Sequence, residues 1–193
     1  MKRYFEIKSM SKFNKKLTKR TAPEFLELFL EGKDEKILSL KEEFYTETKS
    51  EVFNCTEEDL NNLHKWASRK VAFTEKWREE MDDTNIPIWV YKVDKLEHMN
   101  TSNFYTKDFM KLQDKIILLF GDCLISHIPG AQWDYSKRPG YMSYNLPIVR
   151  TPKNEEIFFL DTVGSKIKHF YENDSIKLKL GEYYKKLLTQ YNS

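Results

Sequence analysis

Cysteine is scarce in this chain, since only Cys55 and Cys123 occur among its 193 residues. Small disulfide-rich scaffolds carry many more cysteines, so the sequence excludes a scaffold of that kind. Cys123 lies in the most apolar stretch of the chain, where we expect a buried free thiol. A chain without disulfides suits a reducing cytoplasm, which is the location that we predict.

Long apolar runs are missing as well. No uncharged apolar run approaches the roughly 18 residues that a membrane-spanning helix needs. The first ten residues, MKRYFEIKSM, are basic but have no apolar stretch behind them, so we expect no secretory signal. With 40% hydrophobic and 32% charged residues, the composition predicts a soluble globular protein without a membrane partner. The length favours one domain.

The motifs of several large enzyme classes are absent. The six glycines form neither a dinucleotide-binding pattern nor a phosphate-binding loop, and no nucleophile elbow occurs. The four histidines are far apart, and no Cys-x-x-Cys pair is present to supply zinc ligands. We therefore expect no catalytic residue, no metal and no cofactor.

Alanine is rare, with four residues, and lysine outnumbers arginine by 26 to 6. This usage is typical of an AT-rich coding sequence and favours a bacterial source. Positive charge gathers at the beginning, because residues 1–20 hold eight basic side chains and one acid, a net +7. A basic arm can neutralise nucleic-acid phosphates. Few arginines and little aromatic patterning accompany it, so we favour a solvated surface segment, either an arm or a short strand.

Helical patterns dominate residues 21–193, which we predict to form one domain. Thr21 and Glu24 match a capping box, and Gly32 ends the helix that follows. Thr56 is expected to cap a helix that reaches towards Trp77. Further helices are expected over residues 34–48, from Thr106 or Asn103 to His127, from Asp161 to Tyr171, and from Asn173 or Asp174 onwards. Residues 4–8 fit a short strand, and residues 88–93 fit either a strand or the start of a helix.

The helix that ends at His127 is apolar on every side between Ile116 and Ile125, which predicts burial on every side. Gly121 is costly inside a helix, so we expect a neighbouring element to pack closely there. Asp122 must either face solvent or accept hydrogen bonds.

After a Pro-Gly stop, residues 131–136, 141–150 and 157–160 read as three strands joined by tight turns. Pro139 and Gly140 match the central positions of a type II turn. Pro147 cannot donate to a strand ladder, so the middle strand should be bulged or unpaired there. The predicted fold class is α+β: a helix-rich single domain with a small antiparallel three-stranded meander packed on a buried central helix.

Three groups of residues are candidates for function. Tyrosine, tryptophan and arginine gather in the strand segments, and these residue types are enriched at binding hot spots. The predicted binding residues are Trp133, Tyr135, Arg138, Tyr144 and Arg150, with Tyr141 beside them. Asp122 and His127, with Ser126, form a possible polar site at the end of the central helix, although a self-satisfied helix end explains them better. Asp161 with Thr162 is better explained as a helix cap.

The order of motifs over residues 112–161 resembles a helix-plus-hairpin module of uncharacterised bacterial proteins. In that module an apolar helix with Gly-Glu is followed by a Trp and by a Pro-Val or Pro-Ile strand. Here Gly121-Asp122, Trp133 and Pro147-Ile148 stand in those places. Some proteins with the module are predicted immunity or toxin-associated proteins, so the resemblance implies a helix-plus-meander fold and a partner-binding role.

We therefore expect a non-enzymatic bacterial protein that binds another protein, as an immunity or accessory factor. Two alternatives stay open: nucleic-acid binding through residues 1–20, and an enzyme with a site around Asp122 and His127. The sequence says nothing about the oligomeric state.

Overall fold

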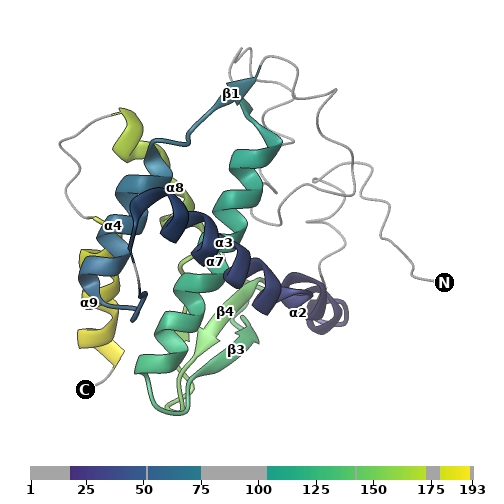
Figure 1. The fold of residues 1–193 in the computed structure, drawn as a ribbon. Helices are drawn as coiled ribbons and strands as arrows, with labels where there is room; N and C mark the ends of the chain where they lie inside the picture. The colour runs from purple at the N-terminus through teal and green to yellow at the C-terminus, as the bar shows by residue number, and fades with distance from the viewer. Residues whose placement is uncertain (1–17, 51, 75–103, 142, 173–178, 192–193) are drawn as a thin grey trace.

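The computed structural model of the chain describes residues 18–50, 52–74, 104–141, 143–172 and 179–191 (Figure 1). These residues form a helix-rich α+β domain with a small antiparallel sheet, which confirms the predicted fold class. The elements in chain order are α2 (Ala22–Leu30), α3 (Lys33–Thr48), α4 (Glu57–Ser68), β1 (Phe73–Thr74), β2 (Phe104–Tyr105), α7 (Lys107–His127), β3 (Gln132–Tyr135), β4 (Pro147–Arg150), β5 (Glu156–Ile157), α8 (Leu160–Glu172) and α9 (Leu180–Tyr191).

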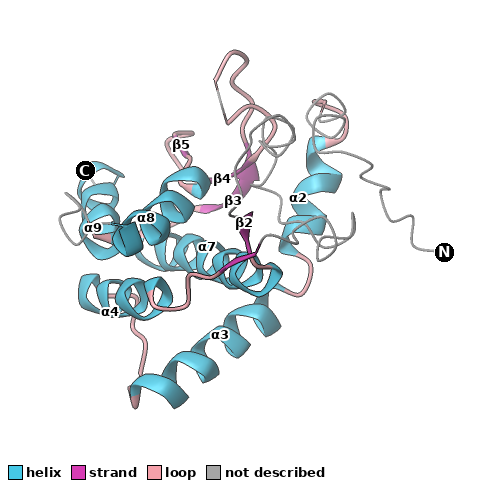
Figure 2. Cartoon of the chain, turned by 90° about the horizontal axis from the view of Figure 1, so that it is seen from above, coloured by secondary structure: helices cyan, strands magenta, loops and turns pink. Residues whose placement is uncertain are grey.

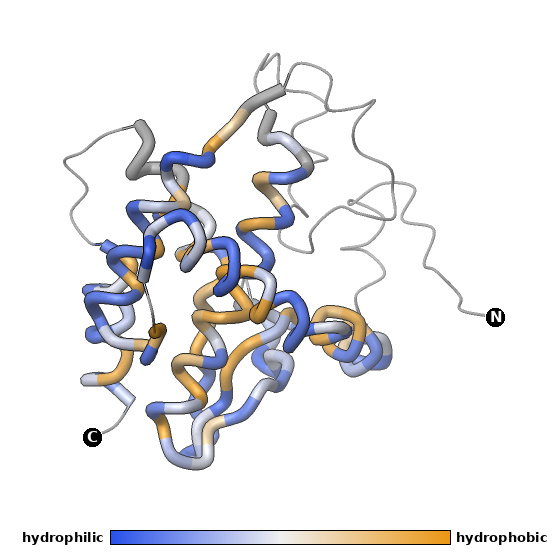
Figure 3. The backbone as a smooth tube through the Cα atoms, in the orientation of Figure 1, coloured by the Kyte–Doolittle hydropathy of each residue, from blue (hydrophilic) through white to orange (hydrophobic). Residues whose placement is uncertain are grey.

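Helix α7 is the centre of the domain. Its N-cap is Thr106, whose hydroxyl accepts a hydrogen bond from the Phe109 amide, so Thr106 rather than Asn103 begins the helix. It packs against α3, α8, α9 and the strands β3 and β4. Figure 2 shows α7 between α3 on one side and α8 on the other, and the lower half of α7 is the hydrophobic part of the tube in Figure 3. The seven apolar residues from Ile116 to Leu124 are almost completely buried, as the sequence pattern predicts.

The three-stranded sheet has the order β3-β4-β5, and both pairs are antiparallel. Val149 pairs with Trp133 on one side and with Ile157 on the other, so these three residues share the face towards α7. Arg150 pairs with Gln132 and Glu156, and this row lies on the opposite, outer face. The meander is confirmed, but its strands are shorter than predicted.

The predicted turn at Pro139 and Gly140 is present, but the second strand does not follow it directly, because β4 begins only at Pro147. Residues 136–146 form a long connection, in which Ser136 and Tyr144 make an isolated bridge. Gly140 does adopt a positive φ of 83°, as the third position of a type II turn requires. Pro147 is the first residue of β4, opposite Tyr135, a position where its missing N–H is tolerated.

The beginnings of three helices test the predicted caps. Thr56 and Asp59 form a reciprocal capping box, with the Thr56 hydroxyl accepting from the Asp59 amide at 3.1 Å. Thr21 makes no side-chain cap to α2, because its hydroxyl is hydrogen-bonded to Thr18 instead, so the capping box with Glu24 is wrong. Asp161 is the second residue of α8, inside its first turn, and not the residue before the helix where the sequence placed a cap.

Helix α4 is also shorter than predicted, because it ends at Ser68 and the chain reaches a second, two-stranded pairing. In this pairing Phe73 of β1 lies opposite Tyr105 of β2. Several predicted segments lie outside the described residues: residues 4–8, Trp77, residues 88–93 and residues 173–178. Most of the basic arm lies outside them too. The two alternatives for residues 88–93 and the predicted start of the last helix therefore stay predictions.

The expected free thiol at Cys123 is wrong. Cys123 of α7 is bonded to Cys55, which lies in the connection between α3 and α4, 68 residues earlier in the chain. The two Cα atoms are 5.3 Å apart, within the range that a disulfide requires. Sequence spacing alone gives no sign of this pairing, because it depends on how the α3–α4 connection crosses the central helix.

Buried His64 joins three helices. It lies on α4, its Nε2 is 3.0 Å from the Lys166 carbonyl oxygen of α8, and its Nδ1 accepts a hydrogen bond from the Leu180 amide of α9. Accepting at Nδ1 leaves the proton at Nε2, which is the neutral imidazole. Burial lowers the pKa of His64, because it disfavours the charged ring.

Candidate functional site

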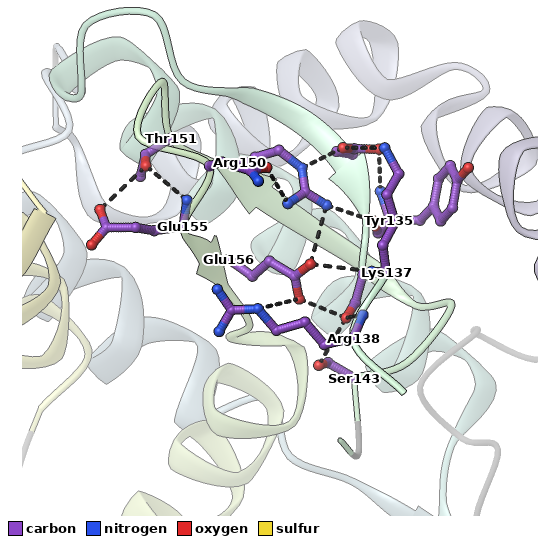
Figure 4. Close-up of polar contacts among 11 residues, drawn as sticks. Tyr135, Lys137, Arg138, Ser143, Arg150, Thr151, Glu155 and Glu156 are labelled. Carbon is purple, nitrogen blue, oxygen red and sulfur yellow. Dashed lines mark hydrogen bonds and ion pairs between the residues drawn. The ribbon is translucent and has the colours of Figure 1, made fainter. Parts of the chain in front are cut away.

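The outer face of the sheet carries a cluster of charged and hydroxyl side chains, which Figure 4 shows in close-up. Its centre is Arg150, whose Nε donates to the Asp134 carboxylate. Its Nη2 donates to Glu156 at 3.2 Å and to the Tyr135 carbonyl at 3.0 Å, and Nη1 donates to Asn154 at 3.0 Å. The Arg150 side chain is only 11% exposed, and its guanidinium hydrogen-bonds to groups of the sheet and its connections.

The same cluster fixes the start of the 136–146 connection. The Ser136 hydroxyl donates to Glu156 at 2.6 Å, and the Lys137 amide donates to the other oxygen of that carboxylate at 3.1 Å. The Ser143 hydroxyl lies 3.3 Å from the Ser136 oxygen, and the Ser136 amide donates to the Leu146 carbonyl. Both ends of the connection are therefore tied to the sheet.

The cluster keeps its carboxylates charged. Burial by itself raises the pKa of Asp134, but hydrogen bonds from Arg150, the Tyr135 amide and Lys137 outweigh it and hold the pKa below its ordinary value. Burial likewise opposes ionisation of Glu156, and its bonds from Ser136, Lys137 and Arg150 bring the net pKa below the ordinary value. The pKa of Arg150 is raised, because the two carboxylates outweigh the effect of its own burial.

The cations of this region are more exposed than the acids with which they pair: the Lys137 ammonium lies 3.2 Å from Asp134, and the Arg138 Nε lies 3.9 Å from Glu156. The side chains of Asp134 and Glu156 are 14% and 6% exposed, whereas those of Lys137 and Arg138 are about half exposed, at 53% and 51%. Tyr141, in the same connection, is 64% exposed and is one of the few large apolar residues at the surface of the described chain. The connection thus presents two cations and a tyrosine beside acids that are largely enclosed on the outer face of the sheet. We call Lys137, Arg138 and Tyr141 the cationic loop.

The predicted binding residues divide between this surface and the interior. Arg138 belongs to the cationic loop, and Tyr135 and Tyr144 are half-buried beside it. The Lys137 ammonium lies 5.0 Å from the centre of the Tyr135 ring. Arg150 supports the loop from below and is too enclosed to offer its guanidinium to a partner.

The placement of Trp133 on the outer, partner-facing surface is wrong, because its indole faces α7. It packs edge-on against Phe29 of α2 at a centroid distance of 5.6 Å and against Phe159 at 5.8 Å. Its Nε1 donates to the Asp122 carboxylate at 2.9 Å. The other oxygen of that carboxylate accepts from Lys33 of α3, so Asp122 is hydrogen-bonded as the sequence required.

The possible polar site at the end of α7 is not assembled. Asp122 bonds to Lys33 and Trp133, whereas His127 Nδ1 lies 2.9 Å from the Tyr184 hydroxyl and 3.2 Å from the Cys123 carbonyl. Ser126 joins the His127 side, with its hydroxyl 3.0 Å from Nδ1. Asp122 and His127 therefore hold different parts of the fold.

Sequence reasoning missed the residues that build the cluster. Asp134 lies on β3 and Glu156 on β5, the two neighbours of the strand that carries Arg150. The register between β3 and β4 could not be predicted, because the 136–146 connection is long. Lys137 was not singled out, because it lies in the segment predicted as a turn, whereas Tyr141 was named beside the binding residues. The one available signal was the alternation in β3, which puts Asp134 on the face opposite Trp133.

Asp114 is a further carboxyl group that the sequence did not single out. It lies on α7, facing α3, where its nearest cation is the Lys36 ammonium at 3.8 Å. Burial raises the pKa of Asp114 to about 6, and the pairing with Lys36 offsets only part of that rise.

Within the described residues, no three His, Cys, Asp or Glu side chains are placed to hold a metal ion. No helix in the same part of the chain is long and apolar enough to cross a membrane. No protein-family model, no curated protein and no solved structure matches this chain. The geometry of the cationic loop and its support is therefore the basis for assigning a function.

Proposed function

We propose that this protein is a non-enzymatic bacterial cytoplasmic factor that binds another protein, in the manner of an immunity or accessory protein. Its partner presents an acidic surface, and the contact is made by the cationic loop. The observation that carries the proposal is the exposure of Lys137, Arg138 and Tyr141 beside the enclosed Asp134 and Glu156.

Charge complementarity supports an acidic partner. Cations at a rim raise the association rate of an oppositely charged protein and disfavour a basic one. Tyrosine and arginine together supply the contacts that dominate many interfaces, because each combines a large contact area with hydrogen-bonding groups. The cationic loop offers one of each beside a lysine.

Pre-organisation supports a binding role for the same loop. A flexible loop loses conformational freedom when it binds, and this loss weakens the complex. Here the Glu156 carboxylate holds the Ser136 hydroxyl and the Lys137 amide, and Arg150 holds Glu156. The base of the loop is therefore ordered before any partner arrives.

The experiment is quantitative affinity purification from the native cells with three tagged proteins. The first is the wild type. The second carries Lys137→Gln, Arg138→Gln and Tyr141→Ser. The third is a matched control with Lys65→Gln, Lys111→Gln and Leu38→Ser, three exposed positions on α4, α7 and α3. Thermal unfolding of each protein establishes that all three are folded.

We expect one protein with an acidic surface to be retained by the wild type and the matched control and to be lost with the loop variant. The complex should also weaken as salt is raised, because the contact is between charged surfaces. Equal retention by the loop variant and the wild type would contradict the proposal. A retained nucleic acid in place of a protein would contradict it too and would favour the basic arm.

A further inference from the structure

The disulfide between Cys55 and Cys123 joins two parts of the molecule with very different surroundings. Cys123 lies inside α7 and is fully buried. Cys55 lies in the connection between α3 and α4 and is half-buried. These are the only cysteines of the chain, so no third thiol competes for the bond. A solvent thiol can approach only from the Cys55 side.

The backbone at Cys55 is in an unusual conformation. Its φ is 58°, in the left-handed region that residues with a Cβ seldom adopt. The amides on either side, those of Asn54 and Thr56, both donate to one oxygen of Asp59, at 2.8 and 3.1 Å. The same Asp59 belongs to the capping box of α4. Asp59 therefore links the backbone conformation at Cys55 to the first turn of α4.

That first turn also supports α9. The Gly181 amide donates to the Asn61 side chain at 2.9 Å, and Gly181 lies so close to the Glu57 carbonyl that no Cβ fits between them. A shift of the first turn of α4 is thus transmitted to the start of α9, whereas the sheet packs on α7 through Trp133 at Gly121 and Asp122.

We propose that Cys55–Cys123 is a reversible thiol-responsive site, at which a small dithiol or glutathione-type thiol controls the attachment of the α3–α4 connection to the central helix. A thiolate attacks the Cys55 sulfur, the Cys55–Cys123 bond breaks, and the electron pair passes to the Cys123 sulfur, which takes a proton from water. A second thiolate then attacks the outer sulfur of the mixed disulfide, so that a small-molecule disulfide forms and Cys55 leaves as a thiolate that takes a proton from water. Two thiols are oxidised to one disulfide, and the two cysteines are reduced.

Reduction releases the restraint on Cys55, so the left-handed backbone relaxes and the Asp59 contacts on both sides of it open. A reducing cytoplasm was predicted for a chain without disulfides; at that proposed location a disulfide is usually transient and either catalytic or redox-sensing, which is the role proposed for Cys55–Cys123. The site itself does not depend on the identity of the binding partner, and its test below is independent of the cationic loop.

The experiment measures hydrogen exchange of the purified full chain by mass spectrometry before and after treatment with dithiothreitol. Alkylation of denatured samples counts the free thiols in each state. The matched control is Cys55→Ser with Cys123→Ala, treated in the same way. A titration of the wild type with mixtures of reduced and oxidised glutathione measures the equilibrium and needs no variant, so the test survives if the control folds poorly.

We expect no free thiol before treatment and two after it. Amide exchange over residues 54–61 should become at least tenfold faster on reduction, while residues 132–135 and 147–150 stay protected. The double variant should be insensitive to the reductant. Two free thiols in air-oxidised protein would overturn the proposal, and so would a fully reduced protein whose exchange over residues 54–61 is unchanged.

Discussion

Gly121 and Trp133 form the tightest contact between the central helix and the sheet. A Cβ on Gly121 would overlap the six-membered ring of the indole and would lie 3.0 Å from the Phe159 ring. The indole reaches this position because its Nε1 is held by Asp122, the next residue of α7. Gly121 and Asp122 together therefore fix the position of Trp133, and with it the packing of the sheet on α7.

Replacing Gly121 with alanine should destabilise the protein by about 1 to 3 kcal/mol, since overpacking outweighs the gain in helix propensity. Urea denaturation followed by circular dichroism measures the change. The matched control is Gly164→Ala on α8, where a Cβ would meet only the Gln113 amide nitrogen at 3.9 Å. That variant should be more stable than the wild type by about 0.5 to 1 kcal/mol. Effects of the same sign at both sites would contradict the packing account.

The Asp122 hydrogen bonds give a second prediction. Asp122→Asn keeps an acceptor for the Trp133 indole and loses the ion pair with Lys33, which is partly exposed and screened by solvent. Asp122→Ala loses both contacts and leaves the indole N–H without its acceptor, at a cost of about 1 to 3 kcal/mol. We expect the alanine variant to be clearly less stable than the asparagine variant. Equal stability would show that the indole bond contributes nothing.

Arg150 should be the most sensitive charged residue of the domain. Arg150→Met leaves the enclosed Asp134 and Glu156 without their shared cation, which should cost about 3 to 5 kcal/mol. The control is Arg138→Met, whose half-exposed side chain lies 3.9 Å from the same Glu156 and should cost less than about 1 kcal/mol. Similar losses for the two variants would contradict the assignment of Arg150 as the support of the loop.

The same cluster predicts a dependence on acid. The pKa values of Asp134 and Glu156 are held below their ordinary values in the folded protein. Their contribution is therefore complete above the unfolded pKa values, near 4, and is lost as the pH falls through the folded ones. In Arg150→Met the carboxyl groups lose this advantage, so the difference in unfolding free energy between wild type and variant should shrink below pH 4. A constant difference down to pH 3 would count against the charge account.

Asp114 should behave in the opposite sense. Its pKa is about 6 in the folded protein, above the unfolded value of 3.8, so the folded state takes up a proton first as the pH falls from 7 to 4. This group therefore stabilises the protein on acidification and destabilises it at neutral pH. Asp114→Asn should raise the free energy of unfolding at pH 8 by about 3 kcal/mol at most, since the shift is about two pKa units and one unit corresponds to about 1.4 kcal/mol. An unchanged pH profile in the variant would refute this assignment.

The predictable part of the fold is the part with local signals. The apolar run from Ile116 to Leu124 identifies the central helix, the sequence of Thr56 and Asp59 identifies a helix start, and Gly121 indicates a close contact without naming Trp133. The disulfide was missed because Cys55 and Cys123 meet only through the tertiary path of the chain. Thr21 shows the same limit at short range, since its hydroxyl has a competing partner in Thr18.

The candidate site was half predictable for a related reason. Residue type identified Arg138 and the neighbouring tyrosines, but strand alternation alone could not tell which face of β3 turns towards α7. The Asp134–Arg150–Glu156 cluster depends on the register across a long connection, and register is set by turn geometry as well as by pattern. Arg150 was therefore expected at the surface and is in fact the buried support of the loop.

The central claim is that the cationic loop binds an acidic protein partner, and the affinity of the purified partner tests it most directly. Isothermal titration should give a dissociation constant at least tenfold larger for the variant with Lys137→Gln, Arg138→Gln and Tyr141→Ser than for the wild type. The control with Lys65→Gln, Lys111→Gln and Leu38→Ser should match the wild type. The same dissociation constant for the loop variant and the wild type would contradict the account.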